Sequence, residues 1–153
     1  MVDINTTIRQ LIKKHRLHSL YFSIFSSLTM GAVNKEIFQS LSMQRTKMAE
    51  TLQVFPYSAN EAPIMSLILE VVFNSWRLFK IALAPSSPFS WLKFCLICER
   101  QVLAQCDELV WNKNISEEMF RIFTVHQQVL KQSATYLKAI INNSTCLPGK
   151  IMT

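Results

Sequence analysis

The chain has 153 residues, 50% of them hydrophobic and 17% charged, and it carries a formal net charge of +6. A chain of this length can form a sufficient hydrophobic core, which excludes a minimal fold that depends on disulfide bonds. The apolar content favours helices whose outer faces also contact a second copy, so we expect a homo-oligomer. Apart from a cluster at residues 13–16 the basic residues are scattered, and no glycine-rich loop or zinc-finger spacing accompanies them, which argues against nucleic-acid binding.

A long first helix is predicted from residue 4 to about residue 29. Its apolar face consists of Ile4, Ile8, Leu11, His15, His18, Phe22, Phe25 and Thr29, spaced three and four residues apart. The basic cluster and the apolar run after it imitate a secretory signal, but His18 and four serines interrupt the run, so we expect no signal peptide. Gly31 suits a helix end with positive φ, and Asn34 can cap the helix that follows.

A second helix is predicted from about residue 34 to residue 55. Its stripe consists of Ile37, Leu41, Gln44, Met48, Leu52 and Phe55. The link before this helix has roughly five residues, which is short enough to make the two helices antiparallel neighbours. Pro56 and Pro63 then mark a loop.

The most hydrophobic stretch of the chain is residues 64–84, which are apolar on most sides. Helical spacing within it predicts an additional helix that is buried on more than one face or used for oligomer contact. Glu70, Arg77 and Lys80 divide the stretch, so no segment reaches the ~18 apolar residues of a membrane span and we expect no transmembrane segment.

Another helix is predicted over residues 91–111, after a cap at Ser87 and a first-turn proline at Pro88. One face carries a lone acid among small or apolar side chains: Leu92, Cys95, Glu99, Val102, Cys106 and Leu109. Cys95 and Cys98 have the spacing of a redox or metal-binding pair, but such pairs normally lie at a turn or a helix start, which favours buried, reduced thiols. Reduced thiols in turn favour a cytoplasmic location.

The last helix is predicted to begin at a cap formed by Asn114 with Glu117, or by Ser116 alone. Its stripe consists of Met119, Ile122, His126, Val129, Ser133, Tyr136 and Ile140. We expect one helical domain over residues 1–141 and a flexible tail over residues 142–153.

Three short motifs stand out in the predicted helices: Phe38 with Glu50-x-Leu52-Gln53, then Trp76-x-x-x-Lys80-x-Ala82, and then Cys95-x-x-x-Glu99. In their order and spacing these motifs resemble those of a bacterial family of ferritin-like four-helix proteins of unknown function. The likeness covers most of residues 4–140. It implies an all-α, ferritin-like, up-and-down four-helix bundle with the additional apolar helix between the second and third bundle helices.

The chain departs from this family at its acidic positions. Where the family has Cys-Glu-Arg-Gly-Glu, this chain has Cys95-Leu96-Ile97-Cys98-Glu99. The family motif has two glutamates, and the first of them is missing here. An acid of the first helix is replaced near Ser19, and a histidine-containing step of the last helix is replaced around Ser133. The resemblance therefore implies a degenerate metal site.

Four ionisable residues are predicted to lie at mid-helix near one another: His15, His18, Glu99 and His126. No Glu-x-x-His sequence occurs, which argues against a di-iron centre. The four residues could hold a single zinc or non-haem metal ion, or they could form a hydrogen-bonded polar layer with Gln44 that fixes helix register.

We therefore expect no cofactor and no catalytic residues, and a structural or interaction module that has lost its acidic di-metal site. The alternatives are a metal-binding or redox protein that uses the His/Glu cluster, and a peripheral membrane protein that binds lipid through the basic first helix.

Overall fold

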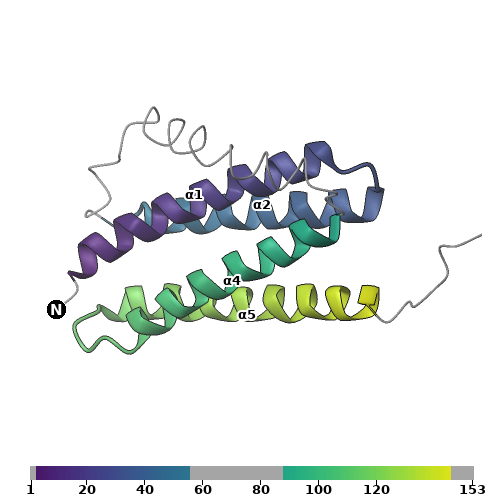
Figure 1. Cartoon of the computed structure of the whole chain (residues 1–153). Coiled ribbons are helices and arrows are strands. Elements are labelled where there is room, and N and C mark those ends of the chain that lie inside the picture. Colours follow the sequence, from purple (N-terminus) through teal and green to yellow (C-terminus); the bar gives the residue numbers. More distant parts are fainter. Residues whose placement is uncertain (1–2, 56–87, 146–153) are drawn as a thin grey trace, which may run out of the picture.

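The computed structural model describes residues 3–55 and 88–145, and all of the regular structure in these residues is helical (Figure 1). The four helices are α1 (Ile4–Leu28), α2 (Ala32–Leu52), α4 (Pro88–Val110) and α5 (Glu117–Thr145). The prediction of an all-α bundle is thus confirmed. The predicted helix over residues 64–84 lies outside the described residues.

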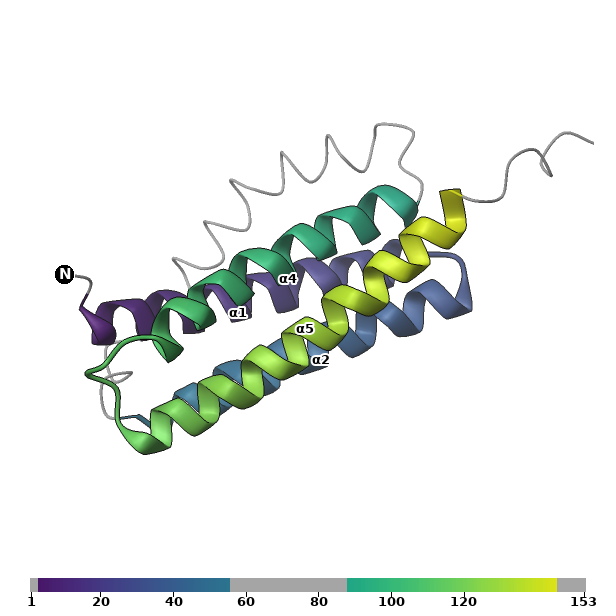
Figure 2. The ribbon, with the colours of Figure 1, turned by 90° about the horizontal axis from the view of Figure 1, so that it is seen from below.

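Helices α1 and α2 form one hairpin, and α4 and α5 form a second hairpin that packs against it (Figure 1, Figure 2). Helix α4 runs parallel to α2, because Phe38 meets Trp91 near one end of the bundle and Arg45 meets Glu99 further along both chains. Leu52 and Pro88 consequently lie at opposite ends of the bundle.

The hairpin α1–α2 begins and turns through specific caps. The carboxylate of Asp3 accepts hydrogen bonds from the backbone N–H groups of Asn5 and Thr6, which satisfies two of the unpaired donors at the start of α1. The prediction for Gly31 was wrong: its φ is −83°, an ordinary extended value, and it is the N-cap residue of α2. Asn34 therefore lies inside α2 and does not cap it.

The other helix ends also refine the predictions. Helix α2 ends at Leu52, three residues before the predicted Phe55. The Ser116 hydroxyl accepts a hydrogen bond from the backbone N–H of Met119, so Ser116 caps α5. Helix α5 continues to Thr145, and the first four residues of the predicted tail are therefore helical.

The described residues form a core of two apolar clusters, one toward each end of the bundle. The cluster near the α1–α2 turn is aromatic, with Phe25 stacked on Trp91 at 5.2 Å between ring centroids and Phe38 beside both rings. The cluster at the other end is largely aliphatic and includes Leu11 and Leu130. A layer of buried polar side chains lies between the two clusters.

None of the four described helices is both long enough and apolar enough to cross a membrane.

Candidate functional site

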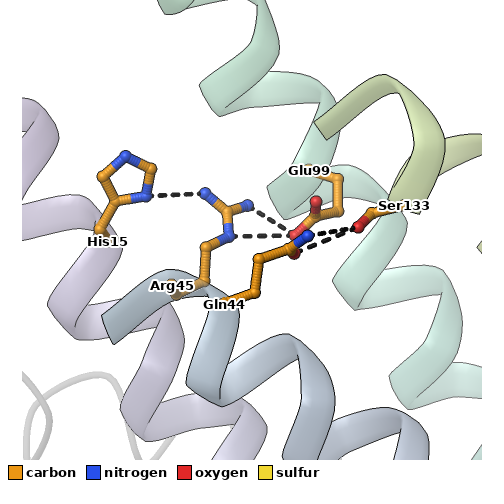
Figure 3. A network of polar contacts seen from close by, with 5 residues as sticks. All are labelled: His15, Gln44, Arg45, Glu99 and Ser133. Carbon is orange, nitrogen blue, oxygen red and sulfur yellow. Dashed lines mark hydrogen bonds and ion pairs between the residues drawn. The ribbon is translucent and has the colours of Figure 1, made fainter. Parts of the chain in front are cut away.

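A fully buried ion pair between α2 and α4 forms the centre of the polar layer (Figure 3). The Nη2 atom of Arg45 lies 2.7 Å from Oε1 of Glu99, and its Nε atom lies 3.0 Å from the same oxygen. Both side chains have zero solvent exposure. This pair links the first hairpin to the second, since Arg45 belongs to α2 and Glu99 to α4.

The guanidinium also contacts α1, because Nη1 of Arg45 donates a hydrogen bond of 3.0 Å to Nδ1 of His15. An arginine can only donate, so Nδ1 of His15 is the acceptor and the proton of the neutral ring is on Nε2. The carboxylate of Glu99, the guanidinium and the imidazole thus form one continuous buried network across three helices.

The other two predicted histidines lie close to this network without joining it through a described hydrogen bond. The ring of His126, on α5, meets that of His15 edge to face at 6.0 Å between centroids. The ring of His18 lies 6.0 Å from that of Phe22, whose face is 6.0 Å from the guanidinium carbon of Arg45. Both histidines are 5% exposed. The structure therefore brings all four predicted residues into one buried layer.

Gln44 lies at the edge of this layer and bridges α2 and α5. Its Nε2 atom donates to Oγ of Ser133 at 3.0 Å, and its Oε1 atom lies 3.1 Å from the same hydroxyl (Figure 3). Both residues are half-buried. The polar layer therefore reaches all four described helices.

Burial keeps the three histidines neutral. It lowers the pKa of His15 well below its ordinary value of 6.5, and the nearby positive charge of Arg45 lowers it further. The same two causes, in the same order, lower the pKa of His126 to about 4, and burial followed by the charges of Arg45 and Lys14 lowers that of His18 to about 3. Each ring can therefore accept and donate one hydrogen bond at neutral pH.

The charge of Glu99 is opposed by burial and supported by Arg45. Burial raises the pKa of the carboxyl, while the charge of the guanidinium and its hydrogen bonds act against that rise. Only Oε1 is engaged, and Oε2 has no hydrogen-bond partner among the described residues. The same holds for Nε2 of His15 and for Nδ1 of both His18 and His126. The layer therefore contains several polar atoms with unused bonding capacity.

The arrangement of these donors is unlike that of a metal centre. No three His, Cys, Asp or Glu side chains in the described residues are grouped so that they could hold a metal ion. A permanent positive charge, the guanidinium of Arg45, contacts both Glu99 and His15 and would repel a metal cation placed between them. The polar layer can therefore hold the two hairpins in register. The positive charge that balances the carboxylate of Glu99 is the guanidinium of Arg45.

Sequence reasoning missed Arg45, although a signal for it was present. Leu41, Arg45, Met48 and Leu52 follow one another at spacings of four, three and four, so the arginine lies on the apolar stripe of α2. That position makes Arg45 a candidate partner for a buried acid, but it does not by itself distinguish a buried guanidinium from one that extends to solvent. The prediction instead placed the neighbouring Gln44 on that stripe.

The cysteines of α4 are buried and free. Burial raises the pKa of Cys95 well above its ordinary value and raises the pKa of Cys98 and of Cys106 to about 12. A thiol reacts as the thiolate, and these three are protonated at neutral pH and inaccessible to solvent. The geometry therefore favours the interpretation as structural thiols over a redox role for Cys95 and Cys98.

We expect these three thiols to be unreactive in the folded protein. In a Cys146→Ser background, a thiol reagent such as dithionitrobenzoate should label none of them under native conditions and all three after unfolding in denaturant. The absorbance of the thionitrobenzoate released by each reacting thiol measures the number of labelled cysteines. Rapid labelling of Cys95 or Cys98 in the native protein would contradict their assignment as buried thiols.

Over residues 3–55 and 88–145, fold and site together define an all-α bundle of four helices with a buried Arg–Glu–His network. Comparisons with protein-family models, with curated proteins and with solved structures found no match for the chain.

Proposed function

We propose that this protein is a ferritin-like helical bundle that acts as a non-catalytic structural or interaction module. The observation that carries the proposal is the fully buried ion pair of Arg45 and Glu99. In this pair the carboxylate of Glu99 binds the guanidinium of Arg45. A carboxylate committed to a guanidinium is a poor general base and a poor metal ligand.

The surroundings of the pair support a structural role. The side chains of Arg45, Glu99 and His15 are fully buried, and the two neighbouring histidines are only 5% exposed. No substrate can therefore reach them without opening the bundle. The histidines are neutral and the nearby thiols are protonated, so neither group provides an activated nucleophile. What the network does provide is a set of directional contacts that join α1, α2 and α4 in one register.

The ferritin-like part of the proposal is supported by connectivity. Ferritin-like bundles have one long crossover between their two helical hairpins, and the parallel course of α2 and α4 requires such a crossover here. The motif Cys95-x-x-x-Glu99 contributes Glu99 to the interior of the bundle. The position of the missing family carboxylate, Leu96, is part of the aromatic cluster.

Metal analysis of the purified full-length protein tests the proposal. After expression in medium supplemented with iron and zinc and without chelators, we expect less than stoichiometric metal by plasma mass spectrometry, and the same value for Glu99→Gln. The alternative function is a metal-binding protein, which the free Oε2 of Glu99 and Nε2 of His15 would favour. One equivalent of metal that is lost in Glu99→Gln would overturn the proposal in favour of that alternative.

A further inference from the structure

The outer face of α2, with the turn that follows it, carries a row of two charged residues flanked by two apolar ones, and its spacings are the same in both chain directions. Met43, Lys47 and Glu50 lie on α2, and Val54 lies just past the C-cap Gln53. The four residues follow one another at spacings of four, three and four, and all four side chains are exposed. The two ends of this row are apolar, with Met43 72% and Val54 73% exposed. The two central positions carry one positive and one negative charge.

This row is complementary to itself when a second copy of α2 lies against it in the antiparallel direction. Met43 then faces Val54 of the second copy, and Lys47 faces Glu50 of the second copy. A two-fold axis repeats both contacts, so a single alignment provides two apolar contacts and two ion pairs. Neither Lys47 nor Glu50 forms an ion pair within the described part of the chain, so both charges are available.

Helix α5 extends the same face with apolar side chains. The hydrogen bonds between Gln44 and Ser133 place α2 and α5 side by side. Val125 and Tyr136, on α5, are 57% and 56% exposed, and by helical spacing they lie on the side of Ser133 that faces away from the core residues Leu130 and Leu137. The face therefore combines a charged, self-complementary row on α2 with an apolar row on α5.

The size of this face suits a dimer. Helix α2 has 21 residues and is therefore about 30 Å long, and two adjacent helices are about 20 Å wide, which gives a footprint of about 600 Å². A stable interface buries about 800 Å² of accessible surface per partner, and side-chain relief adds to a flat footprint. Counted over both partners, the α2–α5 face thus gives about 1,200 Å², which is the low end of the range for stable interfaces.

From this pattern we infer that the α2–α5 face is the contact surface of a homodimer with α2 antiparallel to α2 of the second copy. The inference rests on the proposed function, since it names the partner and the surface of an interaction module. It assigns Lys47 and Glu50 the role of setting the alignment, because any shift along α2 would separate the opposite charges.

Charge reversal tests both the surface and the alignment. Lys47→Glu and Glu50→Lys each place like charges opposite one another twice, and we expect each to weaken dimerisation roughly 10-fold or more. The double variant Lys47→Glu/Glu50→Lys restores opposite charges across the axis and should dimerise within about 3-fold of the natural chain. Sedimentation velocity over a concentration series of the full-length protein measures the dissociation constant, and circular dichroism checks that helicity is retained.

Arg100→Glu and Glu108→Lys are the matched controls, since both residues are exposed on α4, on the other side of the bundle, and neither change should alter the dissociation constant. A monomeric natural chain, or single variants that dimerise as well as the natural chain, would overturn the inference. So would weakened single variants that the double variant fails to restore. Metal content is a separate measurement, so failure of this inference is distinguishable from failure of the proposed function.

Discussion

Replacing Arg45 by methionine is expected to lower the free energy of unfolding by about 3–5 kcal/mol, because it leaves the buried charge of Glu99 without a partner. The same change removes the donor to Nδ1 of His15. A loss of this size is a large fraction of the stability of a small domain. Urea unfolding followed by circular dichroism measures it, and Arg100→Met, an exposed arginine on α4, is the control that should change stability by less than about 0.5 kcal/mol.

The double variant Arg45→Met/Glu99→Leu separates a buried charge from a lost contact. Removing both charged groups abolishes the desolvation cost as well as the attraction, so the double variant should be more stable than Arg45→Met alone by about 2 kcal/mol or more. Nδ1 of His15 still lacks its donor, which should keep the double variant about 1–3 kcal/mol below the natural chain. The single variant Glu99→Leu completes the comparison. If the losses of Arg45→Met and Glu99→Leu simply added in the double variant, Arg45 and Glu99 would not be coupled, and the network described for the polar layer would be wrong.

The helices and the presence of a buried acid were predictable from local patterns. Apolar residues at spacings of three and four define α1, α2, α4 and α5, and these four predictions are confirmed. Glu99 was recognisable because it interrupts an apolar seam with no other acid on it. Such features depend on residues within a few turns of one another, so they appear directly in the sequence.

The partner of that acid was not predictable by the same reasoning. A long cationic side chain on an apolar stripe often extends its charge to solvent, so the position of Arg45 does not by itself indicate burial. Its contact with Glu99 requires α2 and α4 to run parallel, which depends on the crossover between them and on no local signal. The three histidines and Glu99 are all buried in the layer between the two apolar clusters, whereas the guanidinium of Arg45, which lies between Glu99 and His15, was not predicted.

The buried histidines predict a steep loss of stability in mild acid. Each has a folded-state pKa below its ordinary value of 6.5, about 4 for His126 and about 3 for His18, so between pH 6.5 and about 4 the unfolded chain binds protons that the folded chain does not. Stability therefore falls as the pH decreases through this range. Burial raises the pKa of Glu99, so the folded state gains up to one proton there, which partly offsets the loss.

With three histidines contributing and Glu99 opposing them, the free energy of unfolding should fall by about 3–4 kcal/mol per pH unit near pH 5. His126→Leu removes one of the proton-binding groups and should reduce this slope by about 1.4 kcal/mol per pH unit, whatever its effect on stability at pH 7.5. Urea unfolding at half-unit steps from pH 7.5 to pH 4.5 measures both slopes. A flat profile across this range would show that the histidines titrate normally in the folded protein, and hence that the polar layer is open to water.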